Sequence, residues 1–443
     1  MSETPLFVRQ GVAPDSVVIR GARVVDPVEG VDQVMDVRVD GGVIAELGER
    51  ISAIGHREVD GAGLTLAPAF VDPHVHLRVP GREDEETVAS GSAAAAAGGF
   101  CAILAMPNTD PVVDSAAVLG ALVEQALNDA VIPVGFMASI TKGLRGEELA
   151  EMAELAATGA AAFTDDGRPV VSAGMLRRAL QYAAVTGRRI ALHEEEPTLS
   201  GKGQMHEGAV SAELGFTGWP SIGESVMIAR DLAICAYEGT TVHIQHISAW
   251  ESVAELRRWQ ELGVAATGEA SPHHLVLTDE AVRSLDSNMK MNPPLRAERD
   301  RQALIEGLKD GTLSCVATDH APHARHEKEA PFEEAPFGVT GLETAFAVLY
   351  TKLVLPGIIP LELLLERMCQ GPALALGMAV PRIAVGAPAN LVLLDLEARW
   401  QVTEAGFRSK SANSWLLGET LQGQPRLTIA VGRVAHDLGA VPA

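Results

Sequence analysis

Eight apolar stretches of strand length follow one another between residues 64 and 322 of this chain of 443 residues. Most neighbouring stretches are separated by a helix-like segment that closes on glycine, as in EELAEMAELAATG and MLRRALQYAAVTG. Eight parallel strands joined by crossover helices form a closed (β/α)8 barrel, and the alternation therefore predicts that fold. The apolar stretches are LTLAPAFVD, FCAILAMP, IPVGFMASI, AAAFTDD, RIALHEE, TVHIQHIS, VAATGEASP and LSCVATDHAP.

The two ends of the chain have a different sequence pattern. Short β-branched runs separated by Gly and Asp turns occupy residues 15–65, and they return after about residue 380. Each piece alone is too small to bury a core, so we expect both to form one small β-sandwich. The alternative is an independent strand-rich domain at the C-terminal end. The predicted organisation is a first sandwich part at 1–67, the barrel at 68–380 and a second sandwich part at 381–443.

Charge and composition limit the partners. The formal net charge of −23 disfavours nucleic acid and anionic membrane surfaces, but a local cluster of metal, Arg and His could still bind a small anion. The four scattered cysteines form no CxxC pair, which argues against a thiolate site or a disulfide framework. The start MSETPLFVRQ lacks the pattern of a secretory signal, and no long apolar run is present. We expect a cytoplasmic protein.

Ionisable residues follow the apolar stretches where each predicted strand ends. The carboxyl ends of all barrel strands meet at one face, so these residues should converge although they lie far apart in the sequence. His74 and His76 should point to the same side of an extended chain. Buried charged groups are costly unless they are paired or bind a metal ion, which makes packing a poor explanation. The residues are His74, His76, Asp165, Asp166, His193, His246 and Asp319.

Some of these residues have neighbours that compete for the same role. Asp165 and Asp166 point to opposite faces, so we expect one of them to bind backbone amides of the following turn. His243 and His246 also face opposite ways, and we favour His246, which is nearer the strand end. His273 and His274 lie close to the end of the seventh stretch, and we regard them as secondary candidates.

Four imidazoles and two carboxylates exceed the four ligands of one tetrahedral zinc ion. They suit two metal ions that share a bridging carboxylate and a bridging hydroxide. Such a centre makes a nucleophile near neutral pH and polarises a carbonyl oxygen. The predicted reaction class is metal-assisted hydrolysis of an amide or a similar bond.

Six motifs occur in one order over nearly the whole chain: DPHVHLR, AMPNTDP, AFTDDG, NPPLR, ATDHAPH and APFGVTGLETA. Together they resemble the bacterial class I dihydroorotases of the amidohydrolase superfamily. The resemblance implies a zinc-dependent cyclic amidohydrolase that interconverts N-carbamoyl-L-aspartate and L-dihydroorotate in pyrimidine biosynthesis. It implies two Zn²⁺ ions per subunit, with a single ion as the alternative. It also implies a homo-oligomer, with association with aspartate transcarbamoylase as an open question.

The resemblance assigns the ligands residue by residue. His74, His76 and Asp319 resemble the ligands of the more buried zinc, and His193 and His246 resemble those of the second. Asp166 resembles the bridging carboxylate, because its separation from His193 is similar to that in the family. Many relatives use a carboxylated lysine there, whereas this chain has no lysine near the fourth strand end, which disfavours a hydantoinase. Asp319 is also the implied catalytic base.

The implied substrate contacts are Arg78, Asn108, Asn292, His323, Phe337 and Gly338. Arg78 can bind the substrate carboxylate with two hydrogen bonds, and Asn108 and His323 can donate further ones. Asn292 can serve a ring amide, while Phe337 and Gly338 offer backbone groups. The chain departs from the family in having Val79 after HLR, ALHEEEP without the usual Cys, and GEASPHH in place of TPHH.

Three alternatives remain at this stage. The chain could be a hydantoinase or an allantoinase, or a non-catalytic partner of aspartate transcarbamoylase, although the retained ligand set disfavours the last.

Residues 323–338, HARHEKEAPFEEAPFG, are charged and interrupted by proline. They could order over bound substrate as a lid, or they could be a surface segment that does not move.

Overall fold

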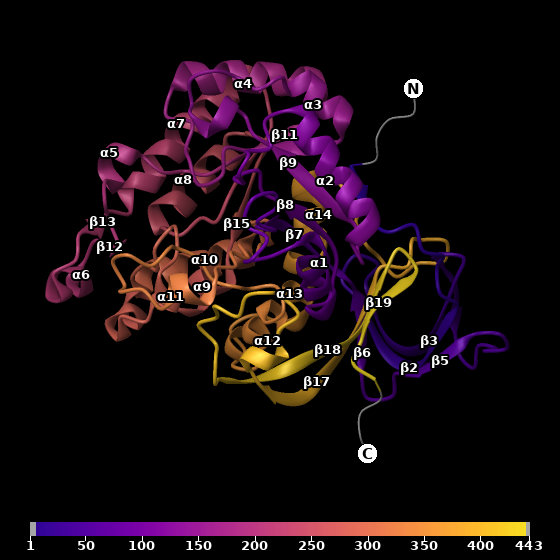
Figure 1. Cartoon of the computed structure of the whole chain (residues 1–443). Helices are drawn as coiled ribbons and strands as arrows, with labels where there is room; N and C mark the ends of the chain where they lie inside the picture. Colours follow the sequence, from indigo (N-terminus) through magenta and orange to yellow (C-terminus); the bar gives the residue numbers. More distant parts are fainter. Residues whose placement is uncertain (1–5, 440–443) are drawn as a thin grey trace.

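The computed structural model describes residues 6–439. Its centre is a sheet of eight parallel strands in the order β16-β15-β14-β11-β10-β9-β8-β7. A parallel bridge between Val75 and His320 brings the first strand to the last, so the sheet is nearly closed. The predicted (β/α)8 barrel is confirmed (Figure 1). Its strands are β7 (Phe70–Val75), β8 (Phe100–Ala105), β9 (Val134–Ala138), β10 (Ala160–Phe163), β11 (Arg189–Leu192), β14 (Val242–Ile244), β15 (Ala266–Ala270) and β16 (Cys315–Val316).

Helices connect the strands and cover the outside of the barrel (Figure 1). Glycines in the left-handed conformation end several of them, including Gly159 after α3 and Gly187 after α4. The longer helices are α1 (Val88–Ala97), α2 (Ala116–Asp129), α3 (Met152–Thr158), α4 (Ala173–Thr186), α7 (Ile222–Glu238), α8 (Trp250–Glu261), α10 (Glu298–Asp310), α13 (Leu361–Met368) and α14 (Gln370–Leu376).

The loops between these strands and helices contain short elements of their own. They are α5 (Pro197–Ser200), α6 (Ala209–Leu214), α9 (Pro272–Val276), α11 (Arg325–Lys328), α12 (Ala345–Leu349), β12 (Met205–His206) and β13 (Gly218–Trp219). Short 3-10 helices are η1 (Lys142–Leu144), η2 (Asp279–Ser284), η3 (Ser287–Met289) and η5 (Glu404–Gly406), and η4 (Tyr350–Val354) is a short π-helix. Among residues 6–439, no helix combines the length and the apolar character needed to cross a bilayer.

Both chain ends contribute to a second sheet, ordered β19-β18-β17-β6-β2-β3-β4 with β5 beside β2. The indigo and yellow segments therefore lie side by side in Figure 1. The sheet encloses its own apolar core, which includes Ile19, Val37, Leu391 and Ile429. The strands are β2 (Val17–Asp26), β3 (Val31–Asp40), β4 (Val43–Gly48), β5 (Arg57–Asp60), β6 (Thr65–Pro68), β17 (Leu391–Gln401), β18 (Thr420–Ala430) and β19 (Arg433–Asp437).

One strand near the N-terminal end lies outside this sheet. Strand β1 (Phe7–Val8) pairs antiparallel with β9 of the barrel. The chain passes from the second sheet into the barrel at Ala69, between Pro68, where β6 ends, and Phe70, where β7 begins. The three-part division of the chain stays a prediction, and β1 belongs by its pairing to the barrel.

Candidate metal centre and substrate pocket

The six side chains predicted as ligands all lie at the carboxyl end of the barrel strands. His74 is within β7, and the other five follow the ends of β7, β10, β11, β14 and β16 by one to three residues. All are buried. His246 and Asp319 have positive φ angles of 29° and 49°, a region that costs non-glycine residues about 1–3 kcal/mol. The fold therefore holds both side chains in place at an energetic cost.

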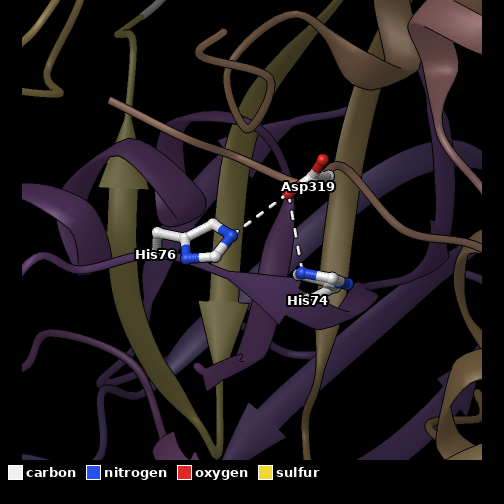
Figure 2. A group of neighbouring side chains, drawn as sticks. All are labelled: His74, His76 and Asp319. Carbon is white, nitrogen blue, oxygen red and sulfur yellow. Dashed lines mark hydrogen bonds and ion pairs between the residues drawn. The ribbon is translucent and has the colours of Figure 1, made fainter. Parts of the chain in front are cut away.

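Three of these side chains form a compact group (Figure 2). Asp319 Oδ1 lies 3.2 Å from His76 Nε2 and 3.5 Å from His74 Nε2. Both imidazoles thus point their Nε2 atoms at the same carboxylate oxygen.

Asp166 joins this group to a second one. Its Oδ1 lies 3.4 Å from His74 Nε2, 3.6 Å from His246 Nε2 and 3.9 Å from His193 Nδ1. Its Oδ2 lies 3.6 Å from His76 Nε2. The carboxylate is therefore central, with all four imidazoles around it.

The donor set fits metal ions. Metal–ligand bonds of about 2.0–2.1 Å in a tetrahedron place neighbouring ligand atoms about 3.3 Å apart, close to the separations found here. Within residues 6–439, buried His74 Nε2 and Asp166 Oδ1 have no hydrogen-bond partner. Buried polar atoms are normally paired, so these two atoms fit a role as metal ligands.

In three of the four imidazoles, the ring nitrogen that faces away from this centre has its own acceptor. His74 Nδ1 donates to Glu269 Oε1 at 2.7 Å, and His76 Nδ1 donates to Asn108 Oδ1 at 3.0 Å. His193 Nε2 donates to Glu195 Oε2 at 3.2 Å. Such outer contacts fix the tautomer and leave the opposite nitrogen free for a metal ion.

Electrostatics in the centre favour ion pairing. Burial alone would raise the pKa of Asp166, but nearby His74 and His246 hold it well below its usual value. Burial opposes the charging of His74, yet the carboxylates of Asp166 and Glu269 raise its pKa well above the ordinary value. A metal ion requires neutral imidazole, so binding at His74 would displace a proton.

A cavity of about 160 Å³ opens beside the centre. Its lining includes all six residues predicted to contact substrate: Arg78, Asn108, Asn292, His323, Phe337 and Gly338. It also includes His76, Asp166, His193, His246 and Asp319. Predicted ligands and predicted substrate contacts therefore share one pocket.

Several of the pocket residues already have protein partners. Arg78 Nε donates to Pro322 O at 3.0 Å and lies 3.1 Å from Glu85 Oε2, while His323 Nε2 donates to Phe337 O at 2.8 Å. The Gly338 N–H donates to Lys290 O at 2.8 Å, so this amide is engaged within the protein. Asn292 Oδ1 is buried without a partner among the described residues and can accept a hydrogen bond from a ligand.

The competing candidates have other partners. Asp165 accepts from the amides of Ile140 and Thr141 at 2.7 and 3.0 Å. These amides follow the neighbouring strand β9, so the expectation that they come from the following turn was wrong. His243 is hydrogen-bonded through both nitrogens, to Thr267 and Glu269.

The secondary candidates of the seventh strand lie apart from the ligand groups. His274 Nε2 donates to Pro293 O at 2.9 Å. His273 is buried beside it, and its Nε2 has no partner within the described part of the chain. Neither histidine belongs to the two ligand groups around His74.

Sequence reasoning missed three residues that support this site. Glu269 is fully buried beneath His74, and its only signal was an ionisable residue within an apolar strand. Lys290 is buried beside Phe337 and Gly338 of the pocket. Asn413 accepts from His323 N at 3.0 Å and donates to Ala321 O and Gly338 O, contacts for which the sequence offers no signal.

Comparison with known proteins agrees with this geometry. Residues 63–252 match the family model described as dihydro-orotase-like. The chain is 45% identical to the dihydroorotase of Anaeromyxobacter sp. (strain K), over 96% of this chain and 99% of that protein. It is 44% identical to the dihydroorotase of Pelotomaculum thermopropionicum, over 94% and 97% of the two chains.

A solved structure with the same fold is the L-hydantoinase (dihydropyrimidinase) from Arthrobacter aurescens. The TM-score is 0.85 at 26% identity, and the match covers 97% of this chain and 98% of the other. The much higher identity to proteins named dihydroorotase favours that branch over the hydantoinases. The chain therefore belongs to the dihydroorotase family of the amidohydrolase superfamily.

Proposed function

We propose that this protein is a zinc-dependent dihydroorotase that reversibly converts N-carbamoyl-L-aspartate to L-dihydroorotate. The observation that carries the proposal is the pocket in which Arg78 meets five of the six predicted ligands, all except His74. A small cyclic amide with one carboxylate fits its chemistry, because the pocket offers a cation at one side and a ligand cluster at the other.

Two zinc ions are the proposed occupants. His74, His76 and Asp319 would hold one, His193 and His246 would hold the other, and Asp166 would contact both. The 3.4–3.9 Å separations around Asp166 Oδ1 support this division. When bound, the ions supply a water of lowered pKa and polarise the amide carbonyl.

The residues of the pocket would orient the substrate. Arg78 would bind the carboxylate. Its Nε contacts Glu85 and Pro322 and its Nη2 lies 3.2 Å from His323 Nε2, which leaves the remaining Nη hydrogens for the substrate. Asn292, whose buried Oδ1 has no partner within residues 6–439, would accept from a ring N–H. Asn108 donates to Asp166 Oδ2 through Nδ2 at 3.1 Å, which leaves its second amide hydrogen for the substrate.

Asp319 would move the proton. In ring opening its carboxylate accepts a proton from the attacking water and delivers it to the departing ring nitrogen. In ring closure the same group starts protonated. Neighbouring histidines outweigh burial and lower the pKa of Asp319, so the free enzyme holds the base form required for opening.

The decisive experiment compares purified protein on dihydroorotate, hydantoin and allantoin, with metal content measured on the same sample. Turnover of dihydroorotate with bound zinc is expected. Preference for hydantoin or allantoin would reassign the substrate. Protein that binds no metal and turns over none of the three would favour a non-catalytic partner of aspartate transcarbamoylase.

The division of the chain into a catalytic barrel and an accessory sheet belongs to the same proposal. We propose that residues 68–380 carry the reaction, with residues 1–67 and 381–443 forming the accessory sheet. The homo-oligomeric state and association with aspartate transcarbamoylase stay predictions from the family resemblance, and the cytoplasmic location stays a prediction from the sequence pattern.

A further inference from the structure

One wall of the pocket is a segment held by lysine side chains. The segment runs from Phe332 to Gly338 and ends in the two residues that line the pocket. We call it the pocket wall. It is the second half of the charged stretch 323–338, which the sequence left open as either a lid or a fixed surface.

Lys290 contacts the pocket wall along its length. Its Nζ donates to Phe332 O at 2.7 Å, to Glu333 O at 3.0 Å and to Ala335 O at 2.7 Å, which uses all three ammonium hydrogens. The ammonium also lies 4.7 Å from the ring centre of Phe337 and 5.4 Å from that of Phe332.

The backbone of the same residue holds the far end of the wall. Lys290 O accepts from Gly338 N at 2.8 Å. Lys290 is two residues before Asn292, so the wall and this substrate contact are fixed by one short stretch of chain. Only 2% of Lys290 is exposed.

A second lysine, from the same stretch 323–338, also binds carbonyls of the pocket wall. Lys328 lies in α11, before the wall, and its Nζ donates to Pro336 O and Gly338 O, both at 3.0 Å. Five of the seven wall carbonyls therefore accept from the Nζ atoms of these two lysines. The carbonyl of Phe337 accepts from His323 Nε2, which links the wall to a predicted substrate contact.

These contacts are hard to exchange for water. A buried donor that is removed leaves its acceptors unsatisfied, which costs more than the hydrogen bond itself contributes. Burial lowers the pKa of Lys290 to about 8, so its ammonium form still predominates at neutral pH. Burial, with the charge of Lys290, lowers the pKa of Lys328 to about 7, and even a neutral lysine amine has two hydrogens for the two carbonyls that Lys328 contacts.

We propose that Lys290 is a positioning residue that, together with Lys328, holds the pocket wall in its substrate-binding shape before any substrate arrives. The wall is then a fixed part of the pocket and not a lid that orders over the substrate. Lys290 does not touch the reacting atoms, and it acts through Phe337, Gly338 and His323. This inference deepens the proposed function. The kinetic test of the inference requires that the proposed function is correct, whereas the exchange test does not.

The first test needs no activity. Amide hydrogen exchange reports on the wall through three amides, because those of Glu334 and Ala335 donate to Pro331 O and that of Gly338 donates to Lys290 O. We expect slow exchange in the ligand-free wild type, changed less than about twofold by dihydroorotate. In Lys290→Met and Lys328→Met we expect exchange at least about tenfold faster in 332–338 and unchanged in the barrel strands. Protection that appears only with dihydroorotate, or exchange unaltered in both variants, would overturn the proposal.

The second test measures binding against turnover. We expect Lys290→Met to raise KM for dihydroorotate about tenfold and to change kcat less than about threefold, with metal content unchanged. Exposed Lys309, which pairs with Glu306 on α10, gives the matched control Lys309→Met, expected to match the wild type. A fall in kcat with unchanged KM would refute the positioning role. If the wild type does not turn over dihydroorotate, the proposed function fails, while the exchange test still decides the inference.

Discussion

His74 Nδ1 donates to Glu269 Oε1 over 2.7 Å at a depth where neither side chain is exposed. The other oxygen of this carboxylate, Oε2, accepts from His243 Nε2 at 2.9 Å. Three strands, β7, β14 and β15, are thus tied together directly beneath the predicted metal centre. Charge from neighbouring His74 and His243 outweighs burial and lowers the pKa of Glu269 to about 2.

Replacing Glu269 should weaken metal binding without touching a predicted ligand. Glu269→Gln keeps the volume but removes the charge that orients His74, and such outer contacts typically contribute about 10- to 100-fold in metal affinity. Zinc competition with a chromogenic chelator measures the change. Exposed Glu306→Gln should leave the affinity unaltered. Equal affinities in both variants would remove Glu269 from this role.

The adjacent aspartates of the fourth strand end provide a matched pair. Asp166→Ala should lose bound metal, because that carboxylate is central to all four imidazoles. Asp165→Ala should keep the metal but lower the free energy of unfolding by about 1–3 kcal/mol, because the buried amides of Ile140 and Thr141 lose their acceptor. Metal analysis and denaturant unfolding separate the two effects. The reverse pattern would exchange their assignments.

Asp319→Asn should remove the proton carrier and keep most of the metal. We expect turnover to fall by about 10²–10⁴-fold in both directions. In the wild type, ring opening requires the carboxylate, so its rate falls as pH is lowered, whereas ring closure requires the acid and should rise. Near-normal turnover of the variant, or parallel pH profiles of the two directions, would exclude Asp319 as the base.

Arg78→Met should mainly weaken substrate binding. It removes the proposed partner of the substrate carboxylate and one of the two arginine partners of buried Glu85, at a cost of about 2–4 kcal/mol. KM for dihydroorotate should rise by about 30- to 1000-fold. Arg257→Met, which removes only a surface pair with Asp310, is the control. An unchanged KM would refute the carboxylate assignment.

Glu343 should make stability depend on pH. Its carboxylate accepts from the amides of Arg408 and Ser409 at 2.9 and 3.0 Å, and burial raises its pKa to about 7. Between the ordinary carboxyl value and pH 7 the folded state binds more protons than the unfolded state, so this group lowers stability as pH rises. Glu343→Gln cannot ionise. Relative to the wild type it should gain about 2 kcal/mol between pH 5 and pH 8. A stability difference that does not vary with pH would contradict this account.

The sequence predicted the barrel and the ligand side chains for separate reasons. Apolar strands and glycine-closed helices are local patterns, so β7 to β16 could be found from short windows of sequence. His74 and Asp319 could be brought together in advance, because all strand ends of a barrel share one face. The same reasoning gave the wrong partner for Asp165, since it considered only the turn that follows the residue.

The residues behind the site were out of reach because their contacts join segments distant in the sequence. Lys290 contacts carbonyls more than 40 residues away, and no motif marks a lysine that binds backbone oxygens. Strand β1 was missed because two residues are too short to show an alternating pattern. The sequence showed Glu269 only as an ionisable residue within an apolar strand. Its two histidine partners could not be identified before the pairing of neighbouring strands was known.

Asn413 comes from the segment between β17 and β18, and its side chain holds His323, Ala321 and Gly338. The mouth of the barrel is therefore completed by a residue that follows all eight barrel strands in the sequence. During synthesis, all eight barrel strands can emerge and pair while the binding site is still unfinished. A polypeptide that ends before Asn413 would carry every predicted ligand and lack the side chain that holds His323, Ala321 and Gly338, so we expect activity only once this segment has been synthesised.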